Sequence, residues 1–203
     1  MENIKRAFRY IPITSIVISL CIIVYFVSLI KYGLTMDGYQ GIDFGGYFPM
    51  LVHFNHEYYR LISANFIHFG LFHLVVNCVS FYQVGLIVER SFSRNKYLLL
   101  IIGTMLATTG LPYLLFLLNG FNAYSVSGGL SGVVFGMVGA IGALALRHQS
   151  IYRDIWRVLL PQLLLMLGLS FVVPTISLSG HIAGLIGGFV LTMLLTGKKR
   201  IIN

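Results

Sequence analysis

Long apolar stretches alternate with short polar segments along the chain. The apolar stretches cover residues 11–30, 71–88, 97–118, 129–146, 155–173 and 180–197. A helix needs about 20 mostly apolar residues to cross a hydrocarbon core of about 30 Å. The pattern therefore predicts an all-α, polytopic membrane protein with a six-transmembrane-helix bundle, in one domain over residues 1–203. A long outer loop, residues 32–70, joins the first two spans.

The composition agrees with a membrane protein. Hydrophobic residues make up 57% of the 203-residue chain and charged residues only 10%, whereas a soluble domain carries about 25% charged residues. The first apolar run follows basic residues, as in a signal peptide. It is too long for one and lacks a small-residue cleavage site, so we expect a retained span.

The basic residues predict how the chain crosses the membrane. Eleven of the 14 Lys and Arg residues fall before span 1, between spans 2 and 3, between spans 4 and 5, or after span 6, and Arg157 lies at the start of span 5 on the same side. Only Lys31 and Arg60 fall on the other side. The positive-inside rule then places both termini in the cytoplasm of a cell-membrane protein. The net charge of +8 is thus a topology signal, and we expect no nucleic-acid partner. The basic residues of the cytoplasmic side are Lys5, Arg6, Arg9, Arg90, Arg94, Lys96, Arg147, Arg153, Arg157, Lys198, Lys199 and Arg200.

Small residues four apart mark spans 4 and 6. Such rows form a flat helix face on which another backbone packs closely, so these two spans should lie side by side. Ser131 and His181 each neighbour the first glycine of one row, and they should therefore meet. The rows are Gly132, Gly136 and Ala140 in span 4, and Gly180, Gly184 and Gly188 in span 6.

Four polar side chains converge at one level of the predicted bundle. Ser131, His181 and His73 lie 16 or 17 residues before the cytoplasmic charges that end their spans. At 1.5 Å per residue this is about 24–25 Å, so all three should lie about 5 Å below the outer surface. Asn77 is one turn deeper on the same helix face as His73. A lone serine in a membrane helix usually bonds back to a carbonyl, but a matched set indicates a site.

The residue types indicate serine chemistry. A neutral imidazole can take the proton of a serine that attacks a carbonyl. Spans 4 and 6 hold no Asp or Glu, so the sequence predicts a dyad of Ser131 and His181 without a carboxylate. His73, Asn77 and the backbone N–H of Ser131 can donate hydrogen bonds to an oxyanion.

Other intramembrane chemistries lack their residues. The stretch "HFNHE" at 53–57 does not have the HExxH order of a zinc protease. All three aspartates lie outside the predicted spans, which disfavours an aspartyl protease. Cys21 and Cys78 show no zinc spacing and are interpreted as structural thiols. We expect no cofactor and no metal.

With these motifs in order on six spans, the chain resembles the rhomboid family of intramembrane serine proteases. The resemblance rests on "EYYRLISANFIHFGLFHLVVN" (57–77), "GLSG" (129–132) and "HIAGLIGG" (181–188). It implies that Ser131 is the nucleophile, His181 the general base, and His73 and Asn77 oxyanion donors. Phe135 stands where the family often has a tyrosine against the histidine, and Tyr59-Arg60 where it has Trp-Arg. Supporting positions are then Phe135, Gly129 and Gly132.

The resemblance also implies the partners. They would be single-span transmembrane protein substrates within the lipid bilayer, cut near the outer face, to which the site opens. One alternative is a catalytically silent rhomboid-like protein that binds or controls the quality of membrane proteins; such relatives lack the serine or the histidine. A transporter would predict related halves and a site at the midplane, and neither is visible.

Overall fold

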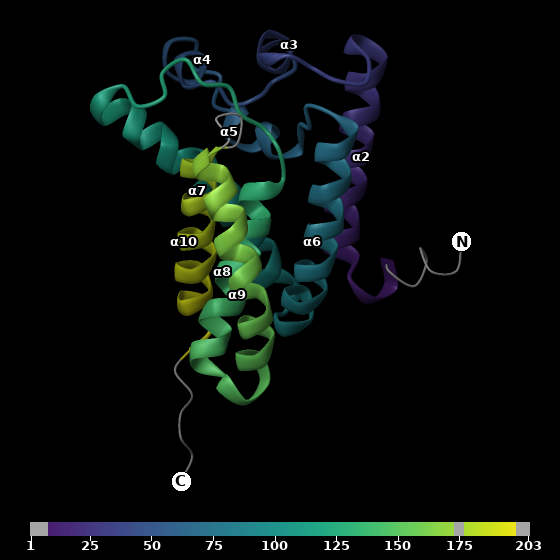
Figure 1. Ribbon diagram of the computed structural model, residues 1–203, viewed down its shortest axis with the longest axis vertical. Coiled ribbons are helices and arrows are strands. Elements are labelled where there is room, and N and C mark those ends of the chain that lie inside the picture. Colours follow the sequence, from purple (N-terminus) through teal and green to yellow (C-terminus); the bar gives the residue numbers. More distant parts are fainter. Residues whose placement is uncertain (1–7, 173–176, 198–203) are drawn as a thin grey trace.

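The computed structural model describes residues 8–172 and 177–197, and helices running along one common direction dominate it (Figure 1). Within these residues the extended structure is limited to isolated β-bridges, so the predicted all-α class is confirmed. The long helices are α2 (Pro12–Tyr32), α6 (Leu71–Ser91), α7 (Arg94–Asn119), α8 (Ser131–Arg147), α9 (Gln149–Val172) and α10 (Leu178–Leu195).

Five of the described helices, α2, α6, α7, α9 and α10, are long and apolar enough to cross a membrane. The remaining long helix, α8, has 17 residues, or about 25 Å at 1.5 Å per residue. The predicted count of six crossings therefore includes one helix that is shorter than a hydrocarbon core of about 30 Å.

Helix α8 is the centre of the bundle. Every residue from Gly132 to Ala145 is buried, and α6, α7, α9 and α10 all pack against it. A helix that is apolar on all sides belongs in an interior, and the small side chains of α8 leave room for four neighbours. The candidate serine is thus the first residue of the most enclosed helix.

Helices α8 and α10 touch through their backbones. A Cβ added to Gly184 would collide with the carbonyl of Gly132, and one added to Gly188 with the carbonyl of Gly136. These are the glycines that the spacing of four singled out, so the predicted side-by-side packing of the two helices is confirmed.

Polar contacts join the start of one helix to the end of another at two places in the bundle. The buried Glu89 carboxylate at the end of α6 accepts hydrogen bonds from the backbone N–H groups of Ile13 and Thr14, at 2.8 and 2.9 Å. These are orphan donors of the first turn of α2. The Lys96 ammonium at the start of α7 donates to the carbonyl of Leu195 at the end of α10, at 2.7 Å. The helix ends that carry Arg90, Arg94 and Lys96 therefore gather at one end of the bundle. Of the other basic residues used for the topology, Lys5, Arg6, Lys198, Lys199 and Arg200 lie outside the described residues.

The outer loop is built from short helices packed over the other end (Figure 1). They are α3 (Gly38–Asp43), α4 (Pro49–Phe54), α5 (Arg60–Ser63) and the 3₁₀ helix η1 (Ala64–Phe66). The Arg60 guanidinium is buried and donates to the carbonyls of Ile42 and Gly46 and to the Glu57 carboxylate. Burial alone would raise the pKa of Glu57, yet hydrogen bonds from Arg60 and Tyr59 hold it below its usual value. Arg60 and Glu57 therefore hold segments of the outer loop together.

Several helix ends differ from the predicted ones. The fifth helix begins at Gln149 and not at 155, so Arg153 lies on the helix and not in the loop before it. The first two turns of α9 are polar, and Arg153 and Arg157 form exposed ion pairs with Asp154 there, so the apolar pattern missed this part of the helix. The predicted last residue of this span, 173, lies outside the described residues. Helix α7 begins at Arg94, three residues before the predicted 97, because its first turn is polar and the apolar pattern did not include it.

Candidate active site

Ser131 and His181 are joined by a hydrogen bond between α8 and α10. The Ser131 Oγ lies 2.8 Å from the His181 Nε2. Ser131 is half-buried at the first position of α8, and His181 is 5% exposed in the first turn of α10. Helix α10 begins at Leu178, and the Ser177 hydroxyl caps this start by accepting a hydrogen bond from the Gly180 N–H. The rows of small residues predicted that Ser131 and His181 lie together, and the structure confirms this contact.

Phe135 forms one wall for the imidazole. Its ring lies parallel to that of His181, with the centroids 4.2 Å apart and the planes inclined by 15°. Phe135 is one turn after Ser131 on α8, so the serine and the aromatic face lie on the same side of the helix. The stack restricts rotation of the histidine about its side-chain bonds.

The segment before Ser131 is shaped by glycine. Gly129 has φ of +125°, a conformation that L side chains rarely adopt. A Cβ there would also lie only 2.9 Å from the His73 Nε2. The apolar run predicted that this helix begins at 129. The backbone conformation of Gly129 explains why α8 begins at Ser131 instead. Gly129 thereby lets His73 lie against the chain two residues before the serine.

His68 supports the same segment from the outer loop. It is 1% exposed and accepts a long hydrogen bond, 3.4 Å, from the Leu130 N–H at its Nε2. Burial, together with the neighbouring His73, lowers the pKa of His68 to about 3, which keeps this acceptor nitrogen unprotonated. His68 lies within the stretch 57–77 that carries the family resemblance, but nothing in the sequence predicted a contact for it.

Asn77 is buried one turn below His73. Its amide donates to the carbonyl of His73 at 2.8 Å, which uses one of its two N–H groups. Within the described part of the chain, no hydrogen bond joins His73 or Asn77 to the Ser131 side chain. The structure thus places Ser131 and His181 together and His73 against Gly129, with Asn77 bonded to the backbone of His73.

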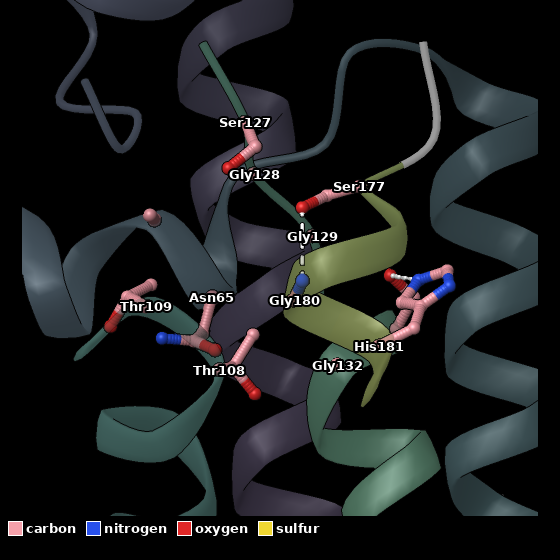
Figure 2. A pocket seen from close by; sticks show the side chains of 12 residues that line it. Asn65, Thr108, Thr109, Ser127, Gly128, Gly129, Gly132, Ser177, Gly180 and His181 are labelled. Carbon is pink, nitrogen blue, oxygen red and sulfur yellow. Dashed lines mark hydrogen bonds between the residues drawn. The ribbon is translucent and has the colours of Figure 1, made fainter. Parts of the chain in front are cut away.

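A small cavity of about 30 Å³ opens beside Ser131 (Figure 2). The side chains of Asn65, Thr108 and Thr109 lie across it from His181. The Asn65 Oδ1 is buried without a hydrogen-bond partner among the described residues. A volume of this size holds about one water molecule. No pattern in the sequence pointed to these three residues, because they are distant from Ser131 in the chain and of common type.

Ser170 on α9 completes the surroundings of the histidine. Its Oγ lies 2.7 Å from the His181 Nδ1. The sequence predicted a dyad because spans 4 and 6 hold no carboxylate, and it did not point to this hydroxyl in span 5. Among the described residues no three His, Cys, Asp or Glu side chains are arranged to hold a metal ion.

Comparison with known proteins identifies the family. The rhomboid-domain sequence profile matches residues 55–198. The chain is 31% identical over 189 residues to rhomboid protease GluP of Bacillus subtilis, covering 93% of this chain and 34% of that protein. It is 27% identical over 190 residues to rhomboid protease GlpG of Haemophilus influenzae, covering 88% of this chain and 90% of that protein. RHOMBOID-like protein 1 of Arabidopsis thaliana is 30% identical over 161 residues, with 78% and 38% covered.

The chain therefore spans about a third of GluP and most of GlpG. The matched residues begin in the outer loop and include α6, α7, α8, α9 and α10, so they contain both Ser131 and His181. The apolar helices agree with a multi-pass membrane protein. On these grounds the chain belongs to the rhomboid family.

Proposed function

We propose that the chain is an intramembrane serine endopeptidase that cleaves single-span transmembrane proteins near the outer face of the membrane. The observation that carries the proposal is the 2.8 Å contact between the Ser131 Oγ and the His181 Nε2 at the end of a buried helix. Nucleophile and base within hydrogen-bond reach are the signature of an activated serine. The protease names of the relatives GluP and GlpG agree with it.

The reaction follows from these two side chains. The Ser131 Oγ attacks the carbonyl carbon of the scissile peptide while its proton passes to the His181 Nε2. The tetrahedral intermediate collapses when His181 returns that proton to the leaving nitrogen, which frees one product and leaves an ester on Ser131. A water molecule then attacks the ester with His181 as base, and the second product leaves with a carboxylate. Phe135 holds the imidazole in its plane through both steps.

The start of α8 supplies donors for the oxyanion. The first backbone hydrogen bond of α8 runs from the Val134 N–H to the Leu130 carbonyl, so the Ser131 N–H has no partner within the helix. His73 lies against Gly129, and Asn77 retains one free amide hydrogen. We assign these three groups to the developing negative charge, where a preorganised donor acts most strongly.

The topology gives the location of the reaction. We propose that the end of the bundle with Arg90, Arg94, Lys96 and Arg147 faces the cytoplasm, by the positive-inside rule. The site at the start of α8 and α10 lies toward the opposite end, beneath the outer loop. Substrate and bilayer are then the partners of the protein, and the chain needs no metal or cofactor for this chemistry.

A silent rhomboid-like binding protein is the alternative. Its activity would not require a reactive serine, so the two hypotheses differ in one property. A fluorophosphonate forms a covalent ester only with an activated serine hydroxyl. We expect the purified protein to be labelled, and Ser131→Ala and His181→Ala to be unlabelled and to lose cleavage of a single-span substrate.

The control is Ser127→Ala, which removes a hydroxyl from the wall of the same cavity but not the one that contacts His181. It should be labelled at the wild-type rate. Thermal unfolding in detergent should show that all three variants are folded. Labelling of Ser131→Ala, or cleavage that survives in it, would contradict the assignment.

A further inference from the structure

Ser170 lies behind the histidine, on the side away from Ser131. It is 4% exposed on α9, and its Oγ is 2.7 Å from the His181 Nδ1. The three residues come from three helices, so His181 is held between one hydroxyl of α8 and one of α9.

The hydrogen bonds of Ser170 define which nitrogen of His181 carries the proton. The Ser170 Oγ also lies 2.7 Å from the carbonyl of Met166, and a carbonyl can only accept. The single hydrogen of the hydroxyl therefore goes to Met166. The oxygen is left to accept from the His181 Nδ1–H, and a neutral imidazole then has its lone pair on Nε2, facing Ser131.

Most other helix serines in the structure lack this second contact. Ser19 donates to the carbonyl of Ser15 four residues earlier, at 2.9 Å, and this is the common behaviour of serine in a membrane helix. Ser170 makes the same backward bond and also meets an imidazole on another helix. The backward bond is what leaves the Ser170 oxygen free to act as an acceptor only.

No carboxylate of α8, α9 or α10 contacts the His181 Nδ1 in place of the Ser170 hydroxyl. Helices α8 and α10 contain no Asp or Glu, and the only acid of α9 is Asp154, whose side chain is 84% exposed near the other end of the helix. A neutral acceptor also avoids placing an uncompensated charge among apolar helices, which is costly.

We propose that Ser170 is a positioning residue that fixes the tautomer and the orientation of His181. The inference rests on the proposed function, because it assumes that His181 acts as the base for Ser131. A third group that orients the base is a recurring part of serine catalysis. Here it would be a hydroxyl from α9, anchored by its own helix.

The expected size of the effect follows from the kind of bond. A neutral hydrogen bond is worth about 0.5–1.5 kcal/mol, which corresponds to roughly 2–13-fold in rate. We therefore expect Ser170→Val to lower kcat on the order of 10-fold and to leave KM unchanged, since Ser170 is buried behind His181. Ser170→Thr keeps the hydroxyl, adds the same bulk as Val, and should retain most of the activity.

The tautomer provides a readout that a purely structural role would not move. In protein labelled with ¹⁵N-histidine, the His181 Nε2 of wild type and Ser170→Thr should give the signal of an unprotonated nitrogen. Ser170→Val should show a mixture of both tautomers and react more slowly with the fluorophosphonate. Ser19→Ala, which removes only a backward bond, should match wild type in every measurement.

Two results would overturn the inference. One is a wild-type kcat and an unchanged tautomer in Ser170→Val. The other is an equal loss in Ser170→Thr and Ser170→Val, which would show that bulk and not the hydroxyl matters. Either could occur while wild-type protein is still labelled at Ser131, so failure here is distinct from failure of the proposed protease function.

Discussion

Ser131 is a half-buried hydroxyl at the start of α8, and its hydrogen-bond partner His181 comes from another helix. Counting back from the cytoplasmic charges was enough to place Ser131 and His181 at one level, because helix rise is constant. The contact of Ser170 could not be predicted in this way. Its backward bond to Met166 fully explains a lone serine, and only the rotation of α9 shows that the same oxygen also meets His181.

The oxyanion donors give the first residue-scale prediction. We expect His73→Ala and Asn77→Ala each to lower kcat on the order of 100-fold or more, because losing one donor costs about 2.7–4 kcal/mol. Activity should persist, since the Ser131 N–H remains in both variants. Kinetics with a single-span substrate in proteoliposomes tests this. Wild-type turnover in the double variant would show that neither side chain reaches the oxyanion.

His68 gives a prediction on pH. Its pKa in the fold is about 3, below the value of about 6.5 in an unfolded chain. As the pH falls, the unfolded state therefore takes up the proton on His68 first. The contribution of neutral His68 to the free energy of unfolding is fully present above pH 6.5 and is lost as the pH is lowered toward 3. We expect the thermal midpoint of the wild type to fall over this range.

The matched variant is His68→Asn, which cannot titrate. Whatever the thermal midpoint of this variant at pH 7, it should depend less steeply on pH between 6.5 and 4 than that of the wild type. Parallel curves for the two proteins would show that His68 does not contribute to acid sensitivity.

At the scale of helices, the contact of α8 with α10 was readable in advance and the extent of α9 was not. Small residues four apart have one main structural use in membrane helices, which is close packing. The first turns of α9 are instead polar and include Arg153, Asp154 and Arg157, so the helix begins where the apolar pattern gives no signal. Gly129 similarly belongs to the apolar run in the sequence, but its positive φ is not helical, so the helix begins two residues later.

The glycines predict opposite effects at two positions. Gly188→Ala should destabilise the protein by about 1–3 kcal/mol, because the new methyl group would overlap the backbone of Gly136. Gly168→Ala on α9 meets no atom within 4 Å and should be neutral or stabilising, since alanine favours helix by about 0.5–1 kcal/mol. Thermal unfolding in one detergent compares the two. Equal midpoints would contradict the close approach.

At the scale of the whole molecule, the proposed protease function and the proposed depth of the site predict which bond is cut. Backbone carbonyls in a substrate helix are bonded to amides four residues on, so Ser131 can attack only where a few residues have unwound. Unwinding in lipid costs several kcal/mol for each unpaired group, so it should occur near the wet outer edge and at helix-weakening Gly or Pro. The glycine-rich walls around Ser131 further favour a small residue, Ala or Ser, before the cut.

Moving an Ala-containing site stepwise through a test span, and identifying each product by mass spectrometry, measures this preference. We expect cleavage to peak in the outer part of the span. A peak at the centre of the membrane, or cutting after Phe and Trp, would contradict both the depth and the narrow walls.

The backbone contact between α8 and α10 has a further consequence for what limits the rate. Two backbones already in contact cannot be pressed closer, and separating them would dismantle the centre of the bundle. The pair of Ser131 and His181 should therefore not need to assemble when a substrate arrives. The slow event would then belong to the substrate, as the opening of its own helix. We expect a small soluble electrophile to react with Ser131 at one rate in thin and in thick bilayers, while the rate for a protein substrate should change with the bilayer that holds its helix together.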